Sequence, residues 1–243
     1  MKPTTSTSLS PSPADLTKSR LSRPAWERIL DYGISILALL ALMPLFLIVI
    51  VTIKLVSSGP ILFRQKRIGY NGSPFTIYKF RTMHVNAETA SHASHTSELI
   101  KSNRPMTKLD GADSRIIPCG TIMRALGIDE FPQIINVLKG EMSIVGPRPS
   151  IPTEYAEYSK RDKKRLSTLP GLTGLWQVSG KNRLTFDQMI DCDIQYAIRK
   201  SIGLYLWIIL KTPVVLAQQA IESRRPAEIA EMPVALDKRA VGQ

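Results

Sequence analysis

The segment that most restricts the fold of this chain is an uncharged stretch near the N-terminus. It runs for 22 residues, from Tyr32 to Ile53, between Asp31 and Lys54. A helix needs about 20 mostly apolar residues to cross a bilayer, so this stretch is long enough. It exceeds the apolar part of a secretory signal, and no small-residue cleavage site follows it. A core helix is the alternative, but one without a polar face is unusual in so small a domain, so the stretch predicts a membrane helix.

Charge and proline together indicate how this helix enters the membrane. Basic residues lie on both sides of it: Lys18, Arg20, Arg23 and Arg28 before it, and Lys54, Arg64, Lys66 and Arg67 after it. The positive-inside rule therefore favours the cytoplasmic side for both ends. Pro44, in the middle of the stretch, removes a helix hydrogen bond and kinks or breaks the helix. A re-entrant helix-break-helix that dips into one leaflet satisfies both observations, and a crossing helix with a proline kink is the alternative.

The composition narrows the class of partner. The 243 residues hold 32 Lys and Arg against 20 Asp and Glu, and the formal net charge of +12 suits nucleic acid, a nucleotide or an anionic lipid. The sequence has no basic helix-turn-helix, zinc finger or aromatic RNA-binding signature, so no nucleic-acid partner is expected. Cys119 and Cys192 lie far apart without metal-ligand spacing, which argues against a disulfide framework and a zinc site.

Changes in composition divide the chain into four parts. The expected parts are a disordered tail rich in Ser, Thr and Pro, the membrane helix, one folded domain and a polar tail, over residues 1–24, 25–57, 58–222 and 223–243. A chain of this length can bury one good core, which favours a single domain with appendages.

Three patterns inside the domain predict its elements. Two β-rich runs, 61–68 and 75–80, flank Asn71-Gly72, a pair typical of a hairpin turn. A helix is expected over Phe131–Lys139 and ends at Gly140. The apolar run Ile202–Leu210 is too short to span a bilayer and fits either a bilayer interface or the core. The predicted fold is α+β: a membrane-associated, monotopic single domain with an N-terminal re-entrant helix-break-helix and interfacial amphipathic helices.

The adjacent acids Asp129 and Glu130 are the main candidates for chemistry. An aspartate before the expected helix is a good N-cap, and Pro132 is tolerated in the first turn. The helix dipole and exposed amides keep a carboxylate there ionised, which suits attack on phosphorus. Glu130, pointing elsewhere on the first turn, can hold Mg²⁺ together with substrate phosphate oxygens.

Cations near the acids in sequence strengthen this interpretation. Arg124 lies five residues before Asp129, and Arg148 lies in a corner between two prolines. Either arginine could stabilise charge on a transferring phosphoryl group. Lys79 and Arg81 end the hairpin, where cations on their own are more often solvated than functional. Two adjacent acids alone are weak evidence for phosphate chemistry. The arginines, the Gly-Pro corner and the expected membrane helix strengthen that evidence.

From about Trp26 to Thr212 the chain resembles the bacterial sugar transferase family, the monotopic phosphoglycosyl transferases that start lipid-linked glycan assembly. The resemblance rests on many short motifs in the same order. They are Gly59-Pro60, Phe63-Arg64-Gln65, Arg67-Ile68-Gly69, Lys79-Phe80-Arg81-Thr82-Met83, Asp129-Glu130-Phe131-Pro132-Gln133, Asn136-Val137-Leu138, Gly140-Glu141-Met142-Ser143, Val145-Gly146-Pro147-Arg148-Pro149, Pro170-Gly171-Leu172-Thr173-Gly174 and Trp176-Gln177-Val178-Ser179-Gly180.

The resemblance implies a reaction and a place for it. Members of the family transfer a sugar 1-phosphate from a UDP-sugar to undecaprenyl phosphate and release UMP, in the first membrane step of exopolysaccharide or other surface glycan synthesis. It implies that residues 58–222 are the catalytic domain, on the cytoplasmic face of the bacterial inner membrane and in contact with its lipids. A homodimer is a further expectation. The alternative is a non-catalytic, membrane-bound interaction protein of the same fold.

The resemblance also assigns roles to the candidate residues. It implies that Asp129 attacks the β-phosphorus to give a covalent phosphosugar intermediate and that Glu130 binds the cofactor Mg²⁺. Arg124 corresponds to an arginine that steadies phosphate, and Arg148 to one near the nucleotide. Substrate contacts are also expected from three further side chains in the shared motifs: Lys79, Arg81 and Gln133.

The chain departs from the usual pattern of the family at several positions. Met43 precedes the central proline where relatives often have serine, so a hydroxyl that could bond the freed backbone is missing. Gly127-Ile128 replaces Ser-Leu before the acids, and Tyr205 stands where relatives often have aspartate. None of these changes removes the expected nucleophile, metal ligand or arginines.

Overall fold

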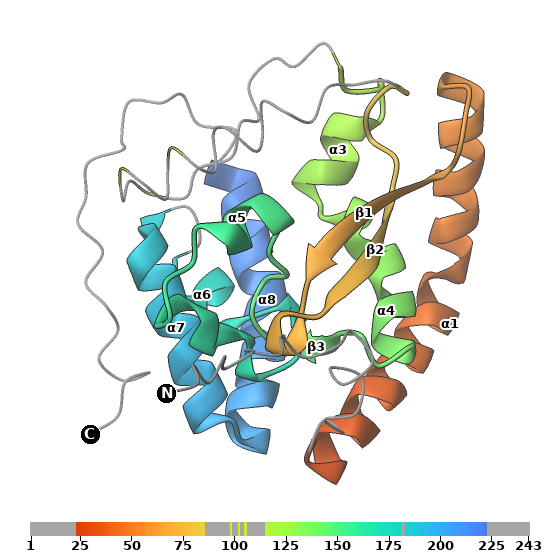
Figure 1. Ribbon diagram of the computed structural model, residues 1–243. Coiled ribbons are helices and arrows are strands. Elements are labelled where there is room, and N and C mark those ends of the chain that lie inside the picture. Colours follow the sequence, from red (N-terminus) through yellow and green to blue (C-terminus); the bar gives the residue numbers. More distant parts are fainter. Residues whose placement is uncertain are drawn as a thin grey trace, which may run out of the picture.

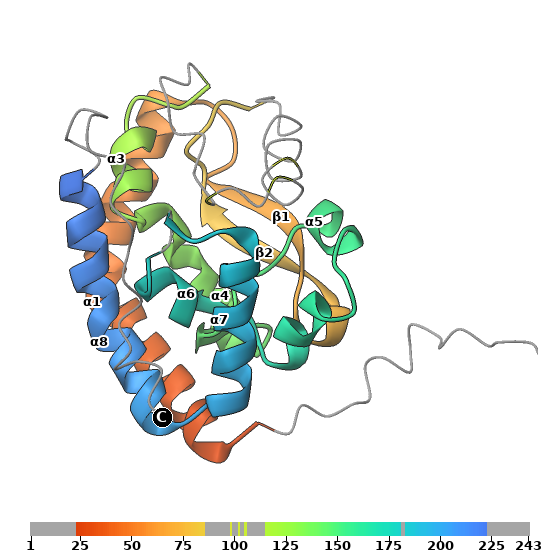
Figure 2. The same cartoon turned by 90° about the vertical axis from the view of Figure 1, so that its left-hand side faces the viewer.

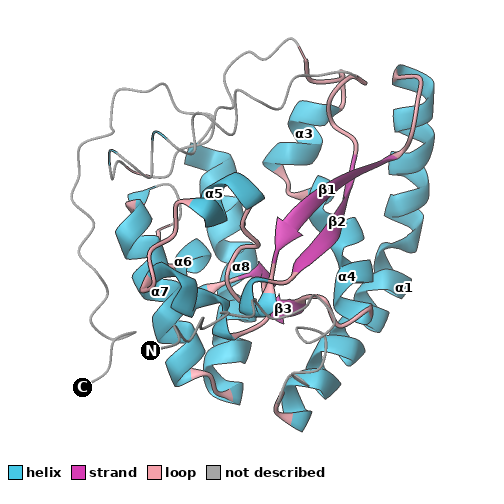
Figure 3. Ribbon diagram, in the orientation of Figure 1, coloured by secondary structure: helices cyan, strands magenta, loops and turns pink. Residues whose placement is uncertain are grey.

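The computed structural model describes residues 23–85, 98, 102, 105, 115–180 and 183–222. The expected tails, residues 1–24 and 223–243, lie almost entirely outside these ranges. Helices make up most of the described chain, and the strands, magenta in Figure 3, are short. The mixture of helices and small sheets confirms the predicted α+β class.

The apolar stretch forms a single long helix, α1, from Ala25 to Val56. It is long and apolar enough to cross a membrane. The expected break is wrong at the level of secondary structure, because the helix continues past Pro44. A proline removes only one backbone hydrogen bond, and the turns on either side can keep theirs. How the helix enters the bilayer stays a prediction.

The hairpin is present as predicted. Strand β1 (Leu62–Ile68) pairs antiparallel with β2 (Pro74–Phe80), so that Leu62 lies opposite Phe80 and Ile68 opposite Pro74. The connection contains one 3-10 turn, η1 (Tyr70–Gly72), in which Asn71 and Gly72 both have positive φ angles of 49° and 79°. Asn and Gly are the residues that adopt this conformation at least cost, which explains the turn.

A second pair of strands, parallel this time, adjoins the proline corner at Pro147–Arg148–Pro149. Strand β3 (Ser143–Val145) pairs with β4 (Gly171–Thr173). The chains approach so closely beyond β3 that a Cβ atom at Gly146 would lie 2.2 Å from the carbonyl oxygen of Leu169. Glycine is therefore required where the chain turns into Pro147–Arg148–Pro149.

Further helices, most of them short, surround the two sheets (Figure 1). In chain order they are α3 (Gly120–Ala125), η2 (Ile128–Gln133), α4 (Ile134–Leu138), α5 (Pro152–Ala156), η3 (Asp162–Ser167), α6 (Leu175–Val178), α7 (Phe186–Arg199) and α8 (Ile202–Glu222). The helix expected over Phe131–Lys139 begins earlier, as the 3-10 segment η2, and becomes α-helical only at Ile134. Helix α8 continues beyond the expected apolar run and through Pro213.

Both ends of α1 pack on the same domain. Near its start, Trp26 contacts Tyr205 of α8, with the ring centroids 5.5 Å apart. Near its end, Val49 and Ile53 are buried in a cluster with Phe80 and other core residues. Figures 1 and 2 show α1 and α8 starting close together at the lower end of the molecule. Between its two packed ends, α1 turns apolar side chains outward, among them Ile36, Leu37, Leu40, Met43, Leu47 and Ile48.

Candidate active site

The acidic pair lies in the first turn of η2. Gly127 precedes this turn with a φ angle of 69°, and the amide of Glu130 donates to the carbonyl oxygen of Gly127 at 3.1 Å. Asp129 is therefore inside the helical turn and is not its N-cap as expected, because Gly127 occupies the capping position. Both acidic residues are half-buried. The pair lies at the surface. The turn that holds it begins with a positive φ angle, which glycine adopts more easily than other residues.

Lys79 from strand β2 reaches the acidic pair. Its Nζ atom lies 2.8 Å from Oε1 of Glu130, and the Glu130 side chain is 42% exposed. The two residues are 51 positions apart in sequence. The structure thus brings together two of the predicted site residues, an acid and a cation, at a place open to solvent.

Asn136 holds the hairpin and the helical segment in register. Its side chain, fully buried, accepts from the amide of Tyr78 at 3.3 Å and donates to the carbonyl oxygen of Thr76 at 2.7 Å. It donates a further bond of 2.7 Å to Glu141. An amide that satisfies three partners fixes the position of α4 against β2, and with it the distance between Lys79 and Glu130.

Helix α1 lies directly behind the acidic pair. The ring of Phe46, in the middle of α1, is 6.2 Å from the ring of Phe131, which follows Glu130 in sequence. Phe46 also makes an edge contact with Phe80 at 5.6 Å. These aromatic contacts join α1, β2 and η2 at one point. The candidate nucleophile is therefore two residues away from a side chain that packs on α1.

The other predicted substrate-binding residues have different surroundings. Arg124 is half-buried on α3, which packs against η2. Gln133, at the end of η2, is buried. Arg81 is also buried and donates to the carbonyl oxygens of Pro60 and Ser57 and to the Ser57 hydroxyl, at 2.6–2.9 Å. These bonds tie the C-terminal end of α1 to β2, and contact of any of the three with substrate stays a prediction.

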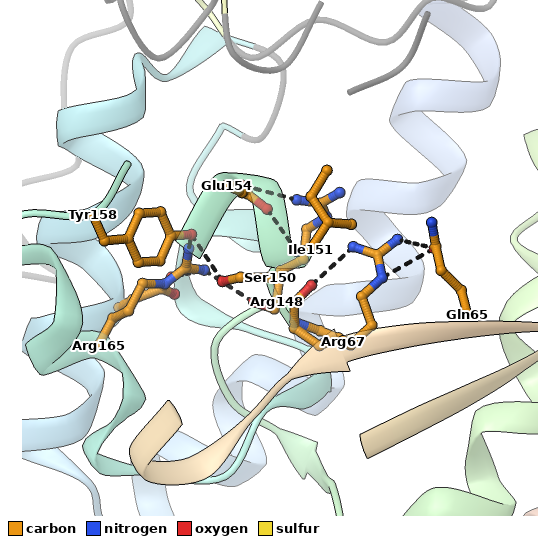
Figure 4. A network of polar contacts seen from close by, with 10 residues as sticks. Gln65, Arg67, Arg148, Ser150, Ile151, Glu154, Tyr158 and Arg165 are labelled. Atoms are coloured by element: carbon orange, nitrogen blue, oxygen red, sulfur yellow. Dashed lines mark hydrogen bonds and ion pairs between the residues drawn. The ribbon is translucent and has the colours of Figure 1, made fainter. Parts of the chain in front are cut away.

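Arg148 lies in a polar network around the proline corner, drawn in Figure 4. Its guanidinium is 3.4 Å from Oε1 of Glu154, and its side chain is 35% exposed. Its carbonyl oxygen accepts a bond of 3.1 Å from Arg165, and the next carbonyl, of Pro149, accepts one of 3.0 Å from Arg67. The network includes three guanidinium groups, and of these only that of Arg148 is substantially exposed.

The charges of this network and of the acidic pair influence one another. Burial and, to a smaller extent, the neighbouring charge of Arg148 lower the pKa of Arg67 to about 10, whereas Glu154 and Glu130 oppose the shift. Burial raises the pKa of Asp193 to about 6, and its ion-pair partner Arg165 opposes this shift. Glu130 therefore lies close enough to the corner to favour the charged form of Arg67.

Sequence reasoning missed most of this network. Arg67 was noted only as a basic residue after the apolar stretch and within a family motif, and Glu154, Arg165 and Asp193 were not considered as functional residues. The three-residue spacing from Ile151 to Glu154 was an available signal, because a glutamate at that position often accepts from the backbone at a helix start. The pairing of Arg67 with Pro149, 82 positions away, depends on the fold.

Comparison with known proteins agrees with this arrangement. Residues 22–219 match the bacterial sugar transferase family. The exopolysaccharide production protein ExoY of Sinorhizobium fredii is 40% identical over 193 residues, which cover 76% of this chain and 83% of that protein. The UDP-glucose:undecaprenyl-phosphate glucose-1-phosphate transferase of Caulobacter vibrioides is 39% identical over 194 residues, 76% of this chain and 67% of that protein.

Another relative is much longer. The galactosyl transferase CpsE of Streptococcus agalactiae is 46% identical over 158 residues, which are 63% of this chain and 34% of that protein. The range that matches the family contains the acidic pair, Lys79 and the proline corner. The chain therefore belongs to the bacterial sugar transferase family and is an enzyme.

Proposed function

We propose that this enzyme transfers a sugar 1-phosphate from a UDP-sugar to undecaprenyl phosphate and releases UMP. The observation that carries the proposal is the meeting of three features at one point: an acidic pair, a lysine that pairs with it, and the membrane helix behind both. A soluble nucleotide-sugar and a lipid-borne acceptor need a site that touches water on one side and a bilayer on the other. Relatives named for undecaprenyl-phosphate sugar transfer support this choice of substrates.

The proposed reaction has two displacement steps at one phosphorus atom. A carboxylate oxygen of Asp129 attacks the β-phosphorus of the UDP-sugar, and the bond from that phosphorus to the bridging oxygen breaks. UMP leaves with the bonding electrons, and the sugar phosphate remains esterified to Asp129. A phosphate oxygen of undecaprenyl phosphate then attacks the same phosphorus, which releases the Asp129 carboxylate and forms the lipid-linked product.

The other site residues handle charge. Within the described residues no group of three or more His, Cys, Asp and Glu side chains could hold a metal ion alone. Two adjacent carboxylates nevertheless fit Mg²⁺, which binds one or two carboxylates and completes its shell with phosphate oxygens and water. We assign Glu130 as its ligand, and bound Mg²⁺ would supply positive charge to the diphosphate. Lys79, Arg124 and Arg148 are the cations proposed to neutralise the remaining phosphate charge.

The same arrangement supports a proposal for the membrane location. The outward side chains of α1 form an apolar surface larger than soluble proteins usually leave exposed. We place this surface in the inner membrane with the catalytic domain on the cytoplasmic face, where UDP-sugars are made. The first step of exopolysaccharide synthesis is the proposed role of the enzyme, and the sugar of the donor is open among hexoses and N-acetylhexosamines.

Substitution of the nucleophile tests the proposal. Asp129→Asn keeps the size of the side chain but removes the charge that attacks phosphorus, so turnover is expected to fall by at least about 10⁴-fold, the scale seen when a nucleophile is removed. Intact-protein mass spectrometry of the wild type with UDP-sugars and Mg²⁺ should show a phosphosugar adduct that the variant lacks. UMP release from a panel of UDP-sugars identifies the donor. An unchanged adduct on the variant would remove Asp129 from this role.

A further inference from the structure

The backbone of the proline corner is held by two buried arginines. Arg165 donates to the carbonyl oxygen of Arg148 and Arg67 donates to that of Pro149, at 3.1 and 3.0 Å. Arg67 is anchored in turn by Gln65, whose Oε1 accepts two bonds from the same guanidinium at 3.1 and 2.6 Å. The backbone on both sides of the Arg148 side chain is therefore fixed by charge-assisted bonds, which are stronger than neutral ones.

Glu154 fixes the side chain of Arg148 and the exit of the corner. Its carboxylate is completely buried, with one oxygen 3.4 Å from the Arg148 guanidinium. The other oxygen accepts from the amide of Ile151 at 3.1 Å. Figure 4 draws both contacts of Glu154 as dashed lines. A single carboxylate thus sets both the direction of the guanidinium and the path of the chain that carries it.

Arg165 is itself anchored from a separate helix. It is completely buried, donates to the Tyr158 hydroxyl at 2.6 Å and lies 2.6 Å from Asp193 of α7. The Tyr158 hydroxyl is also hydrogen-bonded to that of Ser150, at 2.8 Å. The corner is in this way connected to the core through α7, so that Arg165 cannot turn away without leaving Asp193 buried and unpaired.

Stability alone is a poor reason for so many buried charges. Taking an ion pair out of water costs several kcal/mol per ion, and apolar side chains of similar size often stabilise a fold better. The three guanidinium groups outnumber the two carboxylates, Glu154 and Asp193, so the network keeps one positive charge. Arg148 is the member that this network presents to solvent, and Glu130 lies within electrostatic range of another member, Arg67.

We propose that Glu154 and Arg165 are positioning residues that hold the Arg148 guanidinium toward the phosphates of the nucleotide. Glu154 acts on the side chain of Arg148, and Arg165 acts on its backbone. Neither residue contacts substrate. The inference rests on the proposed function, because it takes Arg148 to be a phosphate ligand, and it adds the two residues through which the ligand is preorganised.

A double-mutant cycle tests this proposal. Glu154→Gln removes the buried charge at nearly constant volume and is expected to lower kcat/KM for the UDP-sugar by at least about tenfold, within the range measured for coupled contacts. In an Arg148→Ala background the same change should cost less than about twofold, because its target is gone. Asp191→Asn is the matched control: it also converts an acid paired with an arginine, Arg161, into an amide, but both partners are exposed.

A second variant and a second readout cover the other outcomes. Arg165→Lys keeps the charge but loses the forked geometry of the guanidinium. It replaces Glu154→Gln in the cycle if the melting temperature shows that Glu154→Gln does not fold. Its loss of kcat/KM should depend on Arg148 in the same way. Equal losses in both backgrounds would make these residues merely structural and overturn the proposal, as would wild-type activity in Glu154→Gln. The same set of variants is also compared by the affinity with which each binds UMP. A wild-type protein that binds UMP without turnover would contradict the proposed function, while the affinity cycle still decides the positioning role.

Discussion

At the scale of single residues, Glu130 has two candidate partners, Lys79 and Mg²⁺. Glu130→Gln removes the charge that would hold the metal, so the Mg²⁺ concentration for half-maximal UMP release should rise by at least about tenfold, the effect of roughly 1.4 kcal/mol. The side chain is 42% exposed, and its ion pair with Lys79 contributes little to folding. The melting temperature should therefore stay within about 2 °C of the wild type.

The outcome that would contradict the assignment of Glu130 is equally specific. Wild-type activity of Glu130→Gln at limiting Mg²⁺ would mean that the metal is held elsewhere. Glu130→Asp provides the control, because it keeps the charge and shortens the side chain. We expect it to need an intermediate Mg²⁺ concentration.

Sequence reasoning singles out candidate residues where chemistry restricts the residue type, and their roles stay predictions. The adjacent acids, Lys79 and Arg148 were all recognised, and the structure brings Lys79 to Glu130. The surroundings of Arg81 could not be foreseen, since its donors face the backbone of Ser57 and Pro60. A cation that binds phosphate and a cation that binds carbonyl oxygens look alike in sequence, because both roles need only a set of N–H donors.

At the scale of elements, the parallel pairing of β3 and β4 depends on the absence of a side chain at Gly146. In Gly146→Ala the new Cβ atom would meet the carbonyl oxygen of Leu169 at 2.2 Å, and neither backbone can move without breaking the bond from the Gly146 amide to Thr173. We expect the variant to fail to accumulate in membranes. Gly33→Ala is the control, because a Cβ atom there meets open space on α1. A Gly146→Ala protein with a wild-type melting temperature would refute this.

A second prediction concerns the joint between α1 and the domain. Asp31 is fully buried, accepts from the hydroxyls of Ser143 and Tyr205 and from the amide of Ile144 at 2.7–2.8 Å, and pairs with Arg23. Asp31→Ala leaves these donors unpaired, which typically costs about 3 kcal/mol or more. For a protein of this size the melting temperature in detergent should fall by about 10 °C.

The matched control for this joint is Thr52→Ala. The Thr52 hydroxyl donates to Ile48 within α1 itself and joins no other element. Its loss should move the melting temperature by less than about 2 °C. Similar effects of the two substitutions would mean that Asp31 does not connect the elements. Tyr205 stands where the family often has aspartate. Tyr205→Phe is expected to weaken the joint less than Asp31→Ala does, because it removes only one of the hydrogen bonds to Asp31.

Elements were predicted most reliably where local pattern decides them. The hairpin followed from Asn71-Gly72 between two β-rich runs, and both positive φ angles are present. The start of η2 was misplaced because Pro132 and Asp129 together resemble a helix entry, whereas Gly127 begins the turn two residues earlier. The parallel strands β3 and β4 have only three residues each and were not predicted. Pairing across such a separation depends on tertiary contacts that local sequence does not reveal.

At the scale of the whole molecule, the contacts of α1 bear on how the enzyme sits in the bilayer. A 32-residue helix is about 48 Å long, more than the roughly 30 Å of a hydrocarbon core. Asp31 anchors its first part to β3 and α8, and Ile53 buries its last part beside Phe80. Both anchors belong to one folded domain. A crossing helix would carry one of them to the opposite side of the membrane and break it, so the packing favours a monotopic arrangement.

Cysteine labelling from each side of the membrane tests this arrangement. In a protein whose Cys119 and Cys192 are replaced by serine, single cysteines are introduced at Arg28 and Ser58, exposed positions near the two ends of α1. If both ends face the cytoplasm, a membrane-impermeant maleimide should label neither cysteine in intact spheroplasts and both in inverted vesicles. Lys160→Cys, on the exposed surface of the catalytic domain, marks the cytoplasmic side. Labelling of one end from outside, with Lys160→Cys protected, would mean that α1 crosses the bilayer and that one of its two anchors is broken in the membrane.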